Sequence, residues 1–148
     1  MQYQPPWGRG DFGPGNGRVV RLFPDYAGSV LWFPHPVDYT VSCLDGGLVT
    51  DLIRWEIDYY DALDADFQWR TPAHAADFTA AGVALALRLA LQLGSGFDVE
   101  FASYEPGVTT RRFRSELAPD NPRAAAAFTA LAELPAAAHT APLDRIEL

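Results

Sequence analysis

The order of hydrophobic patterns along the chain constrains its fold more than any other feature. Residues 18–23 and 29–33 are short apolar or alternating runs bounded by turn residues, which is typical of β-strands. Two segments with amphipathic helical spacing follow, at 48–63 and 71–93. Residues 97–101 then alternate apolar and acidic side chains, as a half-buried strand does. Strands on both sides of a helix pair predict an α+β fold.

Both helical segments carry signals that fix their ends. Asp45 is a predicted N-cap of the first helix, because its carboxylate can accept a hydrogen bond from a free backbone N–H. Thr71 and Pro72 provide a cap and a first-turn proline for the second helix, and Gly94 follows its last turn. The sequence therefore predicts two long helices.

The region after residue 101 predicts a hairpin and one more helix. Glu105-Pro106-Gly107 favours a turn, so residues 108–114 can return as an antiparallel strand beside 97–101. Residues 123–134 are an Ala-rich helical segment, and residues 38–42 are a candidate for a further short strand. We expect a small antiparallel sheet of about four or five strands, covered on one face by two long helices, with a short third helix near the C-terminus.

The length of 148 residues predicts one domain. We expect a flexible Gly/Pro arm at 1–17, a single α+β domain at 18–134 and a loose tail at 135–148. The longest apolar run contains Arg88 and falls short of the roughly 20 residues that cross a membrane, and no secretory signal is recognisable, so no membrane association is expected. The single cysteine, Cys43, excludes an internal disulfide and fits a cytoplasmic location.

The negative charge of the chain is concentrated in one segment. Residues 25–66 contain nine acidic residues and one basic residue, Arg54, so they account for the whole net charge of -8. A field of this sign repels nucleic acid and anionic lipid and attracts basic proteins. The expected partner is therefore a basic protein and not a nucleic acid.

Five short motifs follow one another within residues 18–101. They are Pro24-Asp25-Tyr26, Leu31-Trp32, Asp51-Leu52-x-x-Trp55, Tyr60-Asp61 and Leu93-Gly94. Their order resembles a set of small, acidic, uncharacterised actinobacterial proteins. Members of that set often look like cognate inhibitors or accessory proteins, and the resemblance implies such a role here. The chain departs from the set in its Gly/Pro arm, at Gly46-Gly47, where Ser-Pro is usual, and in everything after residue 104.

No motif of a known catalytic or cofactor site stands out, so we favour a non-enzymatic protein without a cofactor or metal. The three histidines are far apart in sequence, and no nucleophile elbow or phosphate-binding loop is present. The acidic residues after Asp58 lack the glycine and the alternating ligands of a calcium loop. An enzyme that uses His35 or His74 remains an alternative, and a pocket joining either histidine to two carboxylates would favour it.

The end of the first helix and the following loop are the candidate partner-binding site. This predicted docking surface consists of the charged residues Asp58, Asp61, Asp64 and Asp66 and the aromatic anchors Phe67 and Trp69. Tyr26 lies in another loop and is a further candidate for an exposed anchor. Charge speeds association, and aromatic anchors dominate interface energetics. We therefore predict a small soluble binding protein that acts as an immunity or antitoxin-like inhibitor.

The hypothesis depends on one condition, and one alternative function remains beside it. The acidic segment must not be neutralised by the arginine-rich strand predicted at 108–114, which contains Arg111, Arg112 and Arg114. The alternative function is a structural or accessory subunit of a larger assembly, with terminal segments that order on neighbouring proteins.

Overall fold

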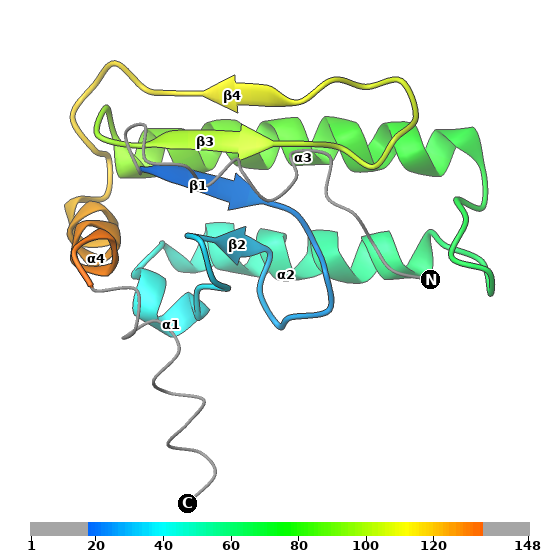
Figure 1. Ribbon diagram of the computed structural model, residues 1–148, viewed down its shortest axis with the longest axis horizontal. Coiled ribbons are helices and arrows are strands. Elements are labelled where there is room, and N and C mark those ends of the chain that lie inside the picture. Colours follow the sequence, from blue (N-terminus) through cyan, green and yellow to red (C-terminus); the bar gives the residue numbers. More distant parts are fainter. Residues whose placement is uncertain (1–17, 135–148) are drawn as a thin grey trace, which may run out of the picture.

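The computed structural model describes residues 18–134, so the expected arm at 1–17 and tail at 135–148 lie outside the described residues. The order of the elements (Figure 1) is β1 (Val19–Leu22), β2 (Leu31–Trp32), α1 (Tyr39–Ser42), α2 (Gly46–Asp61), α3 (Pro72–Leu93), β3 (Asp98–Phe101), β4 (Arg111–Phe113) and α4 (Pro122–Ala132). The fold is α+β, as predicted. Both long helices start at their predicted caps, since Asp45 accepts a hydrogen bond from Leu48 N and Thr71 accepts one from His74 N.

The four strands form one mixed sheet in the order β2-β1-β3-β4. The outer pairs, β1 with β2 and β3 with β4, are antiparallel, and the second of these is the predicted hairpin. The central pair is parallel, with Val20 opposite Val99, so the prediction of an antiparallel sheet is wrong at its centre. The reason is the connection between β1 and β3. Parallel neighbours require a long crossover, and the helices between these strands supply it.

Residues 38–42, a candidate strand in the sequence, form α1 instead. The carboxylate of Asp38 accepts hydrogen bonds from the hydroxyl of Thr40 at 2.6 Å and from its backbone N–H at 2.8 Å. These hydrogen bonds lower the pKa of Asp38. A local cap of this kind competes with strand pairing, which explains the wrong prediction.

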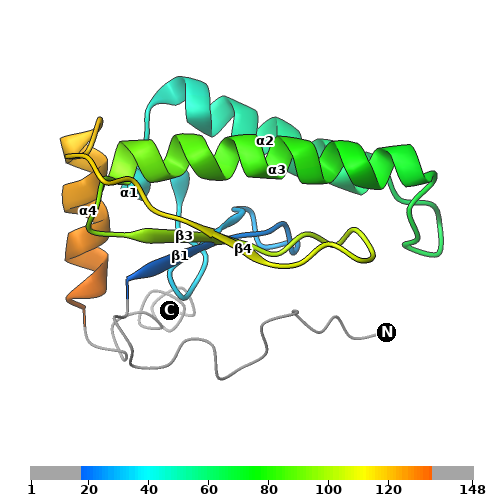
Figure 2. The ribbon, with the colours of Figure 1, turned by 90° about the horizontal axis from the view of Figure 1, so that it is seen from above.

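The two long helices lie on the same side of the sheet (Figure 2). α3 packs directly on β3, whereas α2 packs mainly against α3. Trp55 of α2 reaches the sheet, because its ring stacks on Phe78 at 4.8 Å and meets Phe101 edge-on at 5.8 Å. The prediction of two covering helices is therefore confirmed in part: α3 covers the sheet, and α2 extends the layer.

α3 is largely apolar, and its backbone lies close to the sheet at Gly82. By length and composition alone it would also qualify as a membrane span, a test that core helices of soluble proteins pass as well. Its residues Phe78, Leu85 and Leu89 are buried in the core. At Gly82 a Cβ atom would overlap the ring of Phe101, so this position has to remain without a side chain.

Candidate docking surface

The acidic residues of α2 and the loop after it have few ionic partners. Within residues 18–134, the one ion pair of the acidic segment joins Asp51 to Arg88 of α3 at 2.7 Å, and both side chains are about half exposed. Surface pairs of this kind add little stability. Asp58, Asp61 and Asp66 are exposed, and their carboxylates make no hydrogen bond or ion pair with the described part of the chain. Their charge therefore remains available for a partner.

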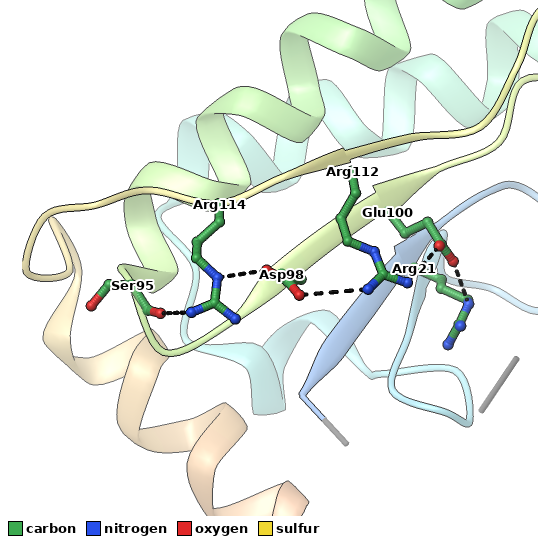
Figure 3. Close-up of polar contacts among 6 residues, drawn as sticks. All are labelled: Arg21, Ser95, Asp98, Glu100, Arg112 and Arg114. Atoms are coloured by element: carbon green, nitrogen blue, oxygen red, sulfur yellow. Dashed lines mark hydrogen bonds and ion pairs between the residues drawn. The ribbon is translucent and has the colours of Figure 1, made fainter. Parts of the chain in front are cut away.

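Arg112 of β4 and Arg114, which follows this strand, pair with carboxylates of β3 instead of with α2 (Figure 3). Arg112 lies 2.9 Å from Glu100 and 3.7 Å from Asp98, and Arg114 lies 2.7 Å from Asp98. Buried Arg21 of β1 approaches Glu100 to 2.8 Å. Asp98 and Glu100 are themselves more than nine-tenths buried, so the arginines neutralise charges that the fold has removed from water. The condition for the docking hypothesis, that these arginines do not neutralise the acidic segment, is thus met.

The loop between α2 and α3 presents Phe67 to solvent. The carboxylate of Asp64 accepts hydrogen bonds from the backbone N–H groups of Asp66 at 2.8 Å and Gln68 at 3.1 Å, and it thereby folds the loop into a tight turn. At the tip, Phe67 has φ = 62° and is 70% exposed. A bulky residue rarely adopts this left-handed conformation, and such strain is concentrated at functional sites.

Trp69 takes a different position from Phe67. Its indole N–H donates a hydrogen bond to the carbonyl of Tyr104 at 3.2 Å, and its ring lies 5.6 Å from Tyr59 and 5.3 Å from Phe78. The side chain is partly buried and packs on the core. It therefore offers a partner less surface than its loop position predicted.

A groove of about 410 Å³ lies between α2 and α3. Its apolar floor is lined by Trp55, Tyr59, Phe78 and two alanines, and its polar residues are Asp58, Asp61, His74 and Asp77. The structure thus brings Asp58 and Asp61 together with a third carboxylate from α3. Asp64 and Asp66, although they follow Asp61 closely in sequence, are not part of this lining.

The same groove joins His74 to carboxylates, the arrangement that would favour an enzyme. The ring Nδ1 of His74 lies 2.7 Å from the hydroxyl of Thr71, and no hydrogen bond among residues 18–134 links the imidazole to Asp58, Asp61 or Asp77. Acid–base catalysis needs the base and its orienting partner within hydrogen-bond reach. No group of His, Cys, Asp and Glu residues in the described part of the chain is suited to hold a metal ion either.

The sequence-based prediction of the site did not include the exposed apolar residues beside the acidic surface. Ile53 and Ile57, one helical turn apart on α2, are 42% and 53% exposed. Tyr26 is 65% exposed, as its loop position predicted, and its ring stacks on Tyr60 at 4.4 Å. Ile53 and Ile57 lie away from the buried stripe of α2 on the helical wheel, and this position would have predicted their exposure. Exposed apolar side chains next to unpaired charge are typical of an interaction surface.

Fold and surface together define a small α+β protein with an uncompensated acidic face. A family model, described as Serratia CdiI immunity protein-like, matches residues 18–104, which is more than half of the chain. The chain belongs to this immunity protein-like family. The match spans β1 to β3 and includes α2, α3 and the loop between them. No curated protein sequence and no solved structure matches the chain.

Proposed function

We propose that this protein is an immunity protein that neutralises a basic protein toxin by docking it on the acidic surface of α2 and the loop after it. Family membership supports the binding of a toxin. The observation that carries the docking mode is the lack of ionic partners for Asp58, Asp61 and Asp66 among the described residues. A cytoplasmic toxin target would place this neutralisation in the cytoplasm.

The residues of the surface have separate roles in this proposal. Asp58, Asp61 and Asp66 steer a cationic partner and raise the association rate. Asp64 contributes charge but also holds the turn that presents Phe67. Phe67 is the apolar anchor that slows dissociation, and Trp69 fixes the end of the loop on the core.

Affinity capture followed by a growth assay tests the proposal. The tagged protein is incubated with extract of the source cells at low and high salt, and bound proteins are identified by mass spectrometry. We expect a basic protein that binds at low salt, dissociates at high salt, and inhibits growth when it is produced alone. Co-production of the immunity protein is expected to restore growth.

Charge reversal tests the site itself. Asp64 is left unchanged because its replacement would disturb the turn, so the variant is D58R/D61R. The matched control is E116R/E133R, which makes the same change in net charge at exposed positions outside the acidic surface. Capture and growth rescue should be lost only in D58R/D61R. Equal capture by both variants would contradict docking through α2.

A second candidate function, acid–base catalysis, is favoured by one observation, the groove that joins His74 to Asp58, Asp61 and Asp77. If the protein neutralised a toxin by modifying it, H74A would abolish growth rescue and still capture the toxin. Under the docking proposal, H74A retains both.

A further inference from the structure

The α2–α3 groove combines an apolar floor with charge of one sign. Trp55 and Phe78 are almost fully buried beneath it, and Tyr59 is partly exposed. Asp58 and Asp61 approach from α2, and Asp77 approaches from α3. A volume of about 410 Å³ is ample for a long side chain together with some water. The lining therefore suits a group with an apolar stem and a cationic head.

The carboxylates of the groove are free to accept such a head. Those of Asp58, Asp61 and Asp77 are exposed and form no hydrogen bond or ion pair within the described residues. They do not converge into a set suited to a metal ion, which again refers to residues 18–134. Carboxylates spread along two helices fit a planar cation with several donors better than a point charge.

Two basic groups near the groove have other hydrogen-bond partners. The guanidinium Nε of Arg70 donates to the backbone carbonyl of Asp61 at 2.9 Å. His74 contacts the hydroxyl of Thr71. Neither forms an ion pair with a carboxylate of the groove. With three carboxylates in the lining against the one guanidinium of Arg70, the local charge is negative.

We propose that the α2–α3 groove receives an arginine side chain of the toxin, with its methylene groups on Tyr59 and Ala81 and its guanidinium among Asp58, Asp61 and Asp77. This inference rests on the proposed function, because it names the feature of the toxin that the immunity protein recognises. A stem packed on apolar surface with its charged head on a polar rim is a common arrangement for arginine.

An NMR titration with small probes tests the groove without the toxin. The labelled protein is titrated with the blocked tripeptide Gly-Arg-Gly and with its lysine and citrulline counterparts. We expect saturable shifts at the amides of Asp58, Asp61, Asp77 and Ala81 and at the indole N–H of Trp55 with the arginine peptide. Citrulline has the same shape without the charge, and its binding should be weaker by about tenfold or more. Shifts that are absent, or that spread evenly over residues 45–66, would overturn the proposal, as would equal binding of citrulline.

A pair of matched variants separates the groove from general acidity. D58N/D77N removes two charges from the groove, and E116Q/E133Q removes two exposed charges outside it. The arginine peptide should bind about tenfold more weakly to D58N/D77N than to the wild type, and its affinity for E116Q/E133Q should be unchanged. An equal loss of affinity in both variants would overturn the proposal that the groove binds arginine. Capture of a basic toxin could still succeed in that case, so failure of the groove and failure of the proposed function give different results.

Discussion

At the scale of single residues, Gly82 sets the distance between α3 and the sheet. In most helices a change from glycine to alanine stabilises by about 1 kcal/mol. At Gly82 the new Cβ would overlap the ring of Phe101, which is 1% exposed and has no room to move. We therefore expect G82A to lower the free energy of unfolding by about 1–3 kcal/mol, measured by urea denaturation. G46A is the control, since a Cβ at Gly46 meets nothing within 4 Å. A G82A variant as stable as G46A would refute this packing argument.

Tyr60 links the β1–β2 loop to α2 through its hydroxyl group. It donates a hydrogen bond to Glu56 at 2.7 Å and accepts one from the backbone N–H of Tyr26 at 2.7 Å. Partial burial, and then the hydrogen bond to Glu56, raise the pKa of Tyr60 well above its ordinary value of 10.0. The folded protein therefore keeps this proton at a pH where the unfolded chain has lost it.

The sign of the pH dependence follows from this shift. Above about pH 10 the unfolded state binds fewer protons at Tyr60 than the folded state does, so stability falls as pH rises. The contribution is fully present below that pH. Y60F should lose about 1 kcal/mol at neutral pH, because two hydrogen bonds are removed. Its stability should then fall less steeply than that of the wild type between about pH 9 and pH 11 in urea denaturation. Parallel pH profiles for the two proteins would show that Tyr60 is not the group involved.

At the scale of elements, local signals predicted the helices better than the sheet. The caps Asp45 and Thr71 and the terminal Gly94 act over one turn, so they could be identified from neighbouring residues. The parallel pairing of β1 with β3 depends on how the chain between these two strands, which contains three helices, packs in the fold. No local pattern in the sequence encodes that packing. The misassigned residues 38–42 show the same limit, because a single capping carboxylate decided their conformation.

The candidate site was predictable to a similar extent. Acidic residues that are neighbours in sequence could be recognised as a charged surface. The groove could not, because it brings Asp58 and Asp61 of α2 beside Asp77, which belongs to another helix. The partial burial of Trp69 likewise depends on contacts with Tyr59 and Tyr104, which lie 10 and 35 residues away along the chain.

The loop between α2 and α3 offers a test of function that is nearly independent of stability. Phe67 has φ = 62°, so replacing it with glycine removes backbone strain of about 1 kcal/mol and adds a similar entropic cost. We expect F67G to unfold within about 1 kcal/mol of the wild type and to bind the captured toxin at least about tenfold more weakly. F67N, which also tolerates the left-handed conformation, should behave alike. L117A truncates another exposed apolar side chain and should leave binding unchanged. Full affinity in both Phe67 variants would exclude this residue as an anchor.

At the scale of the whole molecule, two sets of acidic residues differ in whether an arginine of the same chain pairs with them. On the sheet, Arg112 and Arg114 neutralise the buried carboxylates of β3, and these pairs belong to the fold. On α2, Asp58 and Asp61 repel each other one turn apart in the last turns of the helix, near the negative end of its dipole. The free protein therefore retains a local destabilisation that a cationic partner would relieve.

This division predicts opposite effects of one variant on stability and on binding. D58N/D61N removes the repulsion, so its free energy of unfolding should rise by about 0.5–1 kcal/mol at low ionic strength. The gain should shrink in high salt, which screens exposed charges. D51N is the control, because Asp51 already pairs with Arg88 and its neutralisation should bring no gain. Toxin binding should weaken in D58N/D61N and remain unchanged in D51N. A loss of stability in D58N/D61N would mean that these carboxylates support the fold. Their assignment to a partner would then fail, because the free protein does not need the charges of a surface that serves binding alone.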